Sequence, residues 1–247
     1  MADRYFVETA IAGGEARLVR AEAHHLAHVL RAKPGDEVTL FDGSGAEFPA
    51  RVEHVGRSEI ELAVLSRQAV DRETRVRLTL GVALPKGDRQ RFLVEKAVEL
   101  GVACLVPLQT ERSVDRETPS ALERLRRAVI EASKQCGRNR LMEIATPRKL
   151  ADFLADSTTK GAVHLFAHPI AGPGAKAFVD ACETSIASGD CPNVMLAVGP
   201  EGGFTDSELN FALAERWEIV GCGERILRVE TAALALAAGV MLLSSRA

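Results

Sequence analysis

Short apolar and polar runs alternate along the first 70 residues in the way that is typical of β-strands. The runs RYFV, DEVTLF, EFPARVEHV and EIELAVL, at residues 4–7, 36–41, 47–55 and 59–65, are separated by turn signals such as DGSG. One helix is predicted over residues 22–31, because Leu26, Val29 and Leu30 fall on one helical face. The pattern predicts a small β-barrel over residues 1–70, and the polar residues 66–75 are a candidate linker.

From residue 76 onward, strands and helices alternate. Strands are predicted over residues 76–84, 103–108, 162–167 and 194–198, and helices over residues 88–101, 121–137 and 175–188. This order favours an α/β fold in which right-handed crossovers build a parallel sheet with helices on both faces. Ligands of such sheets bind beyond the carboxyl ends of the strands.

A last helix, predicted over residues 232–244, is apolar on nearly every side. A helix of this kind must be buried on more than one face, and a contact between two subunits would bury it. We therefore expect a homodimer.

The composition is that of an ordinary soluble globular protein, with 247 residues of which 47% are hydrophobic and 26% charged. The first ten residues lack the apolar core of a secretion signal, and no stretch approaches the roughly 20 apolar residues that span a bilayer. We therefore expect a cytoplasmic protein without membrane contact. Because no CxxC pair is present, we expect reduced and mostly buried thiols at Cys104, Cys136, Cys182, Cys191 and Cys222.

The segment MLAVGPEGGFTDSE, residues 195–208, has the order strand, tight loop, helix that is typical of a ligand site. Its MLAV run predicts a buried strand, and Thr205 with Glu208 three residues later predicts a capping box. The glycines Gly199, Gly202 and Gly203 match neither the GxGxxG pattern nor the Walker pattern, which requires a lysine. The loop therefore predicts a site for a ligand other than a nucleotide phosphate.

Charge is uneven along the chain, whose net charge is −3. Residues 84–140 carry twelve Lys or Arg against eight Asp or Glu, whereas residues 1–70 carry eight against eleven. The arginines on the predicted helix of this stretch have two equally good explanations. They bind nucleic acid, or they face solvent on a helix whose C-terminal cations complement its macrodipole. Arg138 and Arg140 follow the Gly137 that ends the helix, and there they resemble a phosphate clamp for RNA or DNA.

His24 and His28 would share one face of the first helix, as two metal ligands do. No carboxylate or cysteine partner is evident nearby in the sequence, so we predict no metal site. We interpret these histidines as exposed or hydrogen-bonded side chains.

The segment GERILRVETAALAL, residues 223–236, places Arg228, Glu230 and Thr231 directly before the apolar last helix. Its RIL run is strand-like. Thr231 alone is explained as a helix N-cap, but Arg228 with Glu230 is not. These two charged residues are therefore candidates for chemistry.

Together, KGDRQRFLVEKAVELGV, PLQTERSV, ASKQCGRNR, LAVGPEGGFTDSEL and GERILRVETAALAL resemble the RsmE family of ribosomal RNA methyltransferases. The segment HHLAHVLRAKPGDEVTLFDGSG extends the resemblance over nearly the whole chain. It implies a PUA-like β-barrel that binds RNA over residues 1–70 and a SPOUT-type methyltransferase domain over residues 76–247. In the second domain it also implies a C-terminal trefoil knot, which periodicity cannot reveal.

The resemblance further implies a pocket for S-adenosylmethionine, built from the GPEGG loop, the ILRVETA loop and the strand end LFAHP. Glycine suits such a pocket because the missing Cβ lets the backbone approach the ligand. Val229 and Cys136 depart from the Thr and Ser that are frequent in the family, which puts fine contacts in doubt. The cofactor-binding residues implied are Leu165, Phe166, Ala167, Val198, Gly199, Pro200, Glu201, Gly202, Gly203, Ile226, Leu227, Arg228, Glu230, Thr231 and Ala232.

The reaction implied is methyl transfer to N3 of one specific uridine in the 16S ribosomal RNA of the small subunit. Positioning contributes most to such a displacement, but N3 must also lose a proton. We predict that Arg228 stabilises the charge on uracil and that Glu230 acts at the reacting end, with Glu201 as the competing carboxylate. The predicted RNA-contacting residues are Arg4, Arg31, Lys86, Arg112, Arg138 and Arg140.

Two other functions stay open. A non-catalytic RNA-binding module would use the barrel and the basic loop, but the intact cofactor loop argues against it. A related methyltransferase acting on a ribose 2′-hydroxyl or on another base would share the motifs. The expected partners are 16S ribosomal RNA or the 30S ribosomal subunit and a second copy of the chain.

Overall fold

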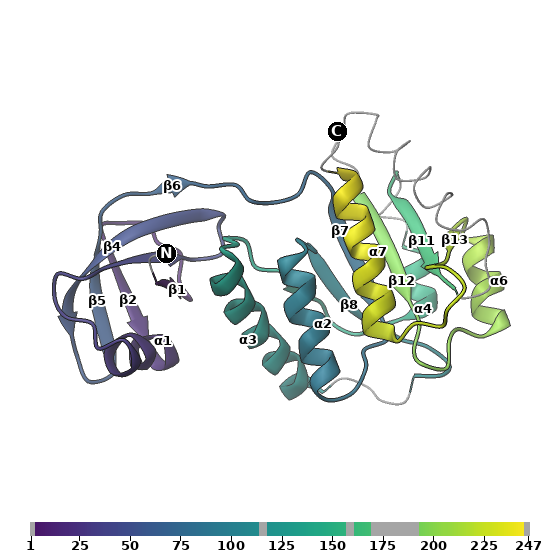
Figure 1. The fold of residues 1–247 in the computed structure, drawn as a ribbon, viewed down its shortest axis with the longest axis horizontal. Coiled ribbons are helices and arrows are strands. Elements are labelled where there is room, and N and C mark those ends of the chain that lie inside the picture. The colour runs from purple at the N-terminus through teal and green to yellow at the C-terminus, as the bar shows by residue number, and fades with distance from the viewer. Residues whose placement is uncertain (1–2, 114–117, 157–160, 169–192, 245–247) are drawn as a thin grey trace. The chain divides into compact units, whose positions relative to one another are not determined.

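The computed structural model describes residues 3–113, 118–156, 161–168 and 193–244. The chain divides into two compact units (Figure 1). The N-terminal unit comprises residues 1–73 and 130–141, and the C-terminal unit comprises residues 74–129 and 142–247. Residues 130–141 thus belong with the N-terminal unit, which the expected division at residues 70 and 76 did not include.

Strands β1 (Arg4–Phe6), β3 (Glu37–Phe41), β4 (Ala46–Val55), β5 (Glu59–Val64) and β2 (Glu15–Val19) form the sheet of the N-terminal unit in this order, and β6 (Gln68–Ala69) pairs with β4. Strands β1 and β3 are parallel, and the other pairs are antiparallel. Four of these strands were predicted. The strand β2 was not predicted, although EARLV alternates strictly in burial, because it is short and its buried side chains are only Ala16 and Leu18.

The helical segment of the N-terminal unit differs from the expectation. The helix α1 (Arg20–His24) runs directly into the π-helical turn η1 (His25–Val29), in which Leu30 N donates to His25 O at 3.2 Å. Leu26 is buried, but Val29 is 61% and Leu30 43% exposed. The prediction of one shared apolar face was wrong, because the five-residue hydrogen bond shifts later side chains around the axis.

Within the described residues, the sheet of the C-terminal unit has seven strands, which are all parallel, as predicted. Their order is β10 (Arg148–Lys149), β8 (Cys104–Gln109), β7 (Arg77–Val82), β12 (Asn193–Val198), β11 (Val163–Ala167) and β13 (Glu218–Val220), and β9 (Glu143–Ile144) pairs with β8. The four long strands match the apolar runs. The three short strands carried no comparable signal.

Helices cover both faces of this sheet (Figure 1). On one face, α2 (Asp88–Glu99) packs beside α7 (Val229–Ser244), which lies against β7 and β12. On the other face, α4 (Leu150–Leu154) packs against β8 and α6 (Asp206–Ala214). The core on this side includes Phe153, Phe166 and Trp217, and the Trp217 indole donates to Leu154 O at 3.0 Å. The helix α3 (Pro119–Cys136) was also predicted.

Other predictions from the sequence have mixed outcomes. The helix expected over residues 175–188, with Cys182, lies outside the described residues, as does Cys191. The last helix begins at Val229, so Thr231 stands in its first turn and is not its N-cap, and the RIL run forms no strand. Of the three described cysteines, only Cys104 is buried, whereas Cys136 and Cys222 are partly exposed. No helix in the described part of the chain is long and apolar enough to cross a membrane.

Candidate cofactor and catalytic site

A cavity of about 240 Å³ lies beyond the carboxyl ends of β11, β12 and β13, which are neighbours in the sheet. This is the edge at which open α/β sheets bind ligands. The cavity is lined mainly by apolar side chains and by loop backbone. The lining comprises Ala167, His168, Val198, Gly199, Pro200, Glu201, Gly202, Gly203, Phe204, Val220, Gly221, Cys222, Gly223, Arg225, Ile226, Leu227, Val229, Ala232 and Leu236.

The GPEGG loop is held in place by its own packing. A Cβ at Gly199 would lie 3.0 Å from the ring of Phe204, which stacks on buried Phe166 with ring centroids 4.1 Å apart. Gly203 closes a turn to Pro200 O at 2.8 Å with φ +69°, where a side chain would be strained. The glycines therefore have structural reasons besides the close approach of a ligand that the sequence suggested.

The predicted capping box follows the loop. The Thr205 hydroxyl accepts from Glu208 N at 3.2 Å, and the Glu208 carboxylate accepts from Thr205 N at 2.8 Å. The other oxygen of Glu208 accepts from Glu111 N at 2.9 Å, and Arg112 Nη1 donates to Gly202 O at 2.7 Å. The residues after β8 thus stabilise the GPEGG loop and the start of α6 through hydrogen bonds. Arg112, which we expected to contact RNA, is engaged with this loop.

Most of the expected cofactor-binding residues are brought together at the cavity. Those that line it are Ala167, Val198, Gly199, Pro200, Glu201, Gly202, Gly203, Ile226, Leu227 and Ala232. Leu165 and Phe166 are fully buried and support it from behind, while Arg228, Glu230 and Thr231 are outside its lining. The side chain of Ile226 is 87% exposed, which is unusual for a large apolar residue.

One arginine joins the two candidate carboxylates. Arg89 Nη2 lies 3.1 Å from Glu201 Oε1, and Arg89 Nη1 lies 3.8 Å from Glu230 Oε2. Glu230 is buried, and its Oε2 accepts no hydrogen bond from the described residues, whereas the side chain of Glu201 is 50% exposed. Of these two residues, Glu201 is part of the cavity lining and Glu230 is not.

Sequence reasoning assigned no role to Arg89, although a signal was present. Arg89 stands in the first turn of α2, where the helix macrodipole disfavours a cation. Acidic partners offset this, and here they come from the GPEGG loop and from the first turn of α7, both more than 100 residues away in the sequence. Arg228, the predicted charge-stabilising residue, is exposed directly before α7.

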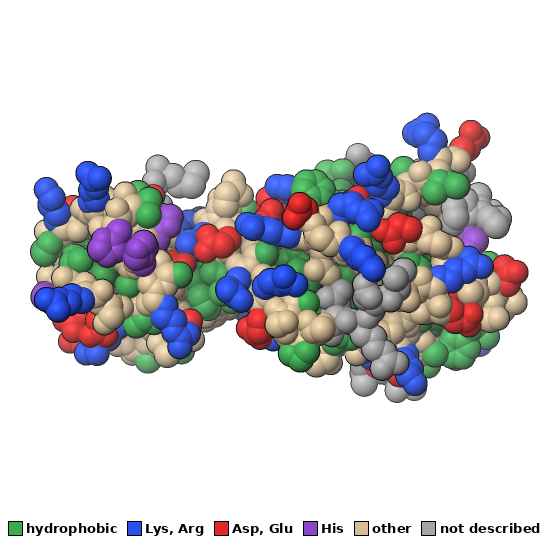
Figure 2. Space-filling view, turned by 90° about the horizontal axis from the view of Figure 1, so that it is seen from below, with side chains coloured by type: hydrophobic (Ala, Val, Ile, Leu, Met, Phe, Trp, Pro, Cys, Tyr) green, Lys and Arg blue, Asp and Glu red, His purple; other side chains and the backbone are tan. Residues whose placement is uncertain are grey.

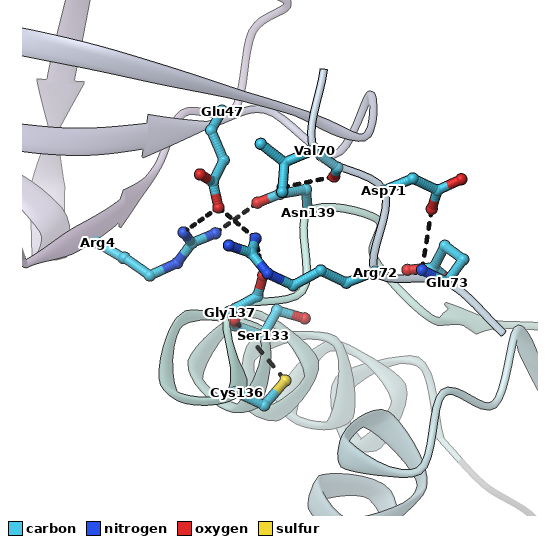
Figure 3. Close-up of polar contacts among 10 residues, drawn as sticks. All are labelled: Arg4, Glu47, Val70, Asp71, Arg72, Glu73, Ser133, Cys136, Gly137 and Asn139. Atoms are coloured by element: carbon cyan, nitrogen blue, oxygen red, sulfur yellow. Dashed lines mark hydrogen bonds and ion pairs between the residues drawn. The ribbon is translucent and has the colours of Figure 1, made fainter. Parts of the chain in front are cut away.

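Two of the predicted RNA-contacting arginines instead bind carboxylates within the N-terminal unit. Arg138 is 5% exposed, and its guanidinium binds the Glu73 carboxylate through Nε at 2.8 Å and Nη2 at 2.6 Å. Arg4 donates to Glu47 at 2.6 Å and to the Asn139 side chain (Figure 3). The Arg138 guanidinium binds Glu73, and Arg4 binds Glu47 and Asn139, although its buried Nε has no hydrogen-bond partner among the described residues. The phosphate role predicted for these two arginines therefore has no support in this structure.

A third arginine, Arg72, whose side chain is 45% exposed, extends these contacts. Arg72 pairs with Glu47 and donates to Gly137 O at 2.9 Å, while the Asn139 side chain donates to Val70 O at 3.2 Å (Figure 3). Burial raises the pKa of Glu47, but the hydrogen bonds from Arg72 and Arg4 outweigh it and hold this pKa below its ordinary value of 4.5. The expected linker residues are thus tied into the N-terminal unit.

The remaining predicted RNA contacts are exposed. Arg140 and Arg31 lie on the surface of the N-terminal unit, and Lys86 is exposed on the C-terminal unit. Histidine side chains gather on the surface of the N-terminal unit (Figure 2), where the rings of His24 and His28 are 4.7 Å apart. Within the described ranges, no group of three or more His, Cys, Asp or Glu side chains is placed to hold a metal ion.

Comparison with known proteins identifies the chain. A family model described as an RNA methyltransferase domain matches residues 72–241, and one described as an RNA methyltransferase PUA domain matches residues 20–65. Ribosomal RNA small subunit methyltransferase E from Synechocystis is 33% identical over 87% of this chain and 69% of its own length. The chain therefore belongs to the RsmE family.

Other RsmE proteins cover the chain almost completely. The one from Mycobacterium bovis is 32% identical over 98% of this chain and 92% of its own length. The crystal structure of the RsmE protein from Neisseria gonorrhoeae, bound to S-adenosyl methionine, has a TM-score of 0.87 and 28% identity, and 98% of each chain is covered. The N-terminal unit is accordingly PUA-like and the C-terminal unit has the methyltransferase fold of these RsmE proteins.

Proposed function

We propose that this protein transfers a methyl group from S-adenosylmethionine to N3 of a uridine in the 16S ribosomal RNA of the small subunit. Membership of the RsmE family supports the reaction class, and the N3 position follows from the resemblance on which the family was first suggested. The single observation that carries the proposal is the cavity at the ends of β11, β12 and β13, which is built from the motifs that the family uses for its cofactor. The cytoplasm, where ribosomal RNA is modified, is the location that this function requires.

The cavity fits a cofactor that has no phosphate. Its lining is largely apolar and includes two loop segments, residues 199–203 and residues 220–223 with 225–227. Such a lining, with few polar groups, suits an adenine, a ribose and a short aliphatic chain. A trefoil knot through these loops, as the RsmE resemblance implies, would fix them relative to each other.

When bound, S-adenosylmethionine would supply an electrophilic methyl carbon, and the electron pair of its bond to sulfur would stay with sulfur. N3 of uracil would provide the electron pair of the new bond and release its proton to a base. The protein must therefore position the base of the nucleotide and accept one proton. Because the Glu201 carboxylate borders the cavity, we assign the proton to it, directly or through one water.

The buried Glu230, which the sequence favoured for this role, acts through Arg89. It lies 3.8 Å from the Arg89 guanidinium, which in turn lies 3.1 Å from Glu201. Arg89 is thus a positioning residue that fixes the Glu201 carboxylate at the edge of the cavity. Arg228, exposed beside cavity-lining Leu227 and Val229, keeps its proposed part in stabilising negative charge on uracil O2 and O4.

The protein works as a homodimer in this proposal. Phe92 of α2 is 48% and Leu242 of α7 67% exposed, and a second copy of the chain would cover these large apolar side chains. We expect sedimentation at micromolar concentration to give a dimer, and Leu242→Glu to shift it toward monomer. Leu213→Glu, a matched change at a 52% exposed leucine of α6, should leave the dimer intact.

The reaction is tested by incubating the protein with unmodified 16S ribosomal RNA or 30S subunits and labelled S-adenosylmethionine, followed by nucleoside analysis. The proposal expects label in 3-methyluridine. Label in a 2′-O-methyl nucleoside or in another base would replace the assigned acceptor, and cofactor binding without any transfer to either RNA would favour a non-catalytic RNA-binding protein.

A further inference from the structure

A second cavity of about 440 Å³ lies in the C-terminal unit, beyond the carboxyl ends of β7 and β8 and beside the first turns of α2 and α3. Its polar lining includes Lys86, Gln90, Gln109 and Arg124. We propose that this cavity binds the target uridine, flipped out of the RNA. The inference rests on the proposed function and adds to it the place at which the acceptor nucleotide binds.

The two cavities share one wall. Pro200 and Glu201 of the GPEGG loop line both of them. Methyl transfer requires the acceptor nitrogen and the methyl carbon to approach within roughly 3–3.5 Å, so the acceptor site must adjoin the cofactor site. The second cavity meets this condition, and it does so at the carboxylate assigned to accept the N3 proton.

The chemistry of the second lining differs from that of the first. Side-chain amides of Gln90 and Gln109 and hydroxyls of Ser113 and Thr118 surround it, and two cations, Lys86 and Arg124, stand in the same lining. Amides and hydroxyls can donate to uracil O2 and O4, and a cation can bind the phosphate beside the base. The cofactor cavity, with its apolar lining, offers no such set.

The size and setting of the cavity also suit one nucleotide. Its volume falls in the range of roughly 300–1,000 Å³ that is usual for small-molecule sites. Enzymes that modify a base extrude it from its stack into such a pocket and read its polar edge there.

Cross-linking locates the base directly. The probe is a 16S ribosomal RNA fragment that carries 4-thiouridine at the position methylated in the nucleoside assay, or at each uridine in turn if no methylation is found. After irradiation, the proposal expects cross-linked peptides from residues 83–90, 107–113 or 118–124. Cross-links confined to residues 220–236 or to the N-terminal unit would overturn it. Cross-links in the second cavity without methylation would retain the cavity as a uridine site and refute the proposed reaction instead.

A matched pair of variants on α3 tests the same inference without cross-linking. Arg124 and Arg127 are both exposed, but only Arg124 lines the cavity, whereas Arg127 Nε contacts Glu123 O of its own helix at 3.5 Å. Arg124→Ala should raise the Kd for the RNA fragment about tenfold, which corresponds to one charged hydrogen bond, and Arg124→Lys should restore part of it. Arg127→Ala should leave the Kd unchanged, and calorimetry should give the same cofactor affinity for all three variants. Equal effects of Arg124→Ala and Arg127→Ala would contradict the assignment.

Discussion

Arginines serve two different purposes in the two units of the molecule. In the N-terminal unit, Arg4, Arg72 and Arg138 bind Glu47, Glu73 and loop carbonyls, so that they hold residues 130–141 and the end of the expected linker in place. In the C-terminal unit, Arg89 holds a carboxylate that is itself half exposed at a cavity. The difference lies in the partner: one set of carboxylates is closed off by protein, and the other remains open to a ligand.

The largest expected effect belongs to Glu201. Glu201→Gln keeps the shape of the side chain but removes the proton acceptor, so the rate of methyl transfer at saturation should fall by about 10²-fold or more. Cofactor affinity measured by calorimetry should change little. Glu215→Gln, at an exposed glutamate after α6, is the control and should be silent. If Glu230→Gln abolishes transfer and Glu201→Gln does not, Glu230 is the base, as the sequence had suggested.

The next effect concerns Arg89 as a positioning residue. Arg89→Ala should lower kcat by roughly 10- to 10²-fold, on the scale of positioned acid–base groups, because the Glu201 carboxylate loses its fixed place, while KM for the cofactor changes less. Arg91→Ala, two residues along the same helix and paired with Glu95, is a matched control. Arg89→Lys keeps the charge but lacks the planar guanidinium that can donate to two carboxylates at once, so it should restore kcat only in part. A change confined to thermal stability would show that Arg89 is merely structural.

In the N-terminal unit, the variant that breaks an arginine–carboxylate pair is Glu47→Gln, and it affects stability and the dependence of stability on pH. Glu47→Gln leaves Arg4 and Arg72 without their carboxylate and should destabilise this unit by about 1–2 kcal/mol at neutral pH. Because the pKa of Glu47 is lowered on folding, its contribution is present above the ordinary value of 4.5 and is lost as pH falls through the lower folded pKa.

The measurement is a series of melting temperatures between pH 3 and pH 7. The curve of the wild-type protein should fall toward that of Glu47→Gln on the acid side, and the two should differ most near neutrality. Parallel curves over the whole range would mean that Glu47 contributes no linked stability.

The smallest effect separates two arginines of one loop. Arg140 is exposed and Arg138 is buried against Glu73, so only Arg140→Ala should lower the slope of RNA affinity against salt, by about one unit. Arg138→Ala should instead lower the melting temperature and leave the salt slope unchanged. The reverse result, measured by filter binding at several salt concentrations, would restore the phosphate role for Arg138.

The sequence predicted the parallel sheet, the position of the GPEGG loop and the capping box at Thr205, because each depends on residues that are neighbours in the chain. It could not predict which arginines are buried. The carboxylate that binds Arg138 is 65 residues away, and the one that binds Arg4 is 43 residues away. A guanidinium beside a glycine in a loop has the same local pattern whether RNA or a distant glutamate satisfies it.

The same limit applies to the candidate site. Arg228, Glu230 and Thr231 were interpreted as one loop, but α7 begins at Val229 and places Glu230 inside its first turn. The role of Arg89 depends on the GPEGG loop and the first turn of α7, which meet α2 only in the folded unit. A truncation at residue 76, which would isolate the expected second domain, would also leave residues 130–141 without the unit to which they belong.

The most direct test of the account is a crystal or cryo-electron microscopy structure of the protein with S-adenosylhomocysteine and an RNA fragment that contains the target uridine. The account predicts the cofactor product in the cavity at the ends of β11, β12 and β13 and the uracil in the cavity beside α2 and α3, with N3 facing the Glu201 carboxylate. A uracil bound elsewhere, or an N3 atom that faces Glu230 and is remote from Glu201, would contradict it.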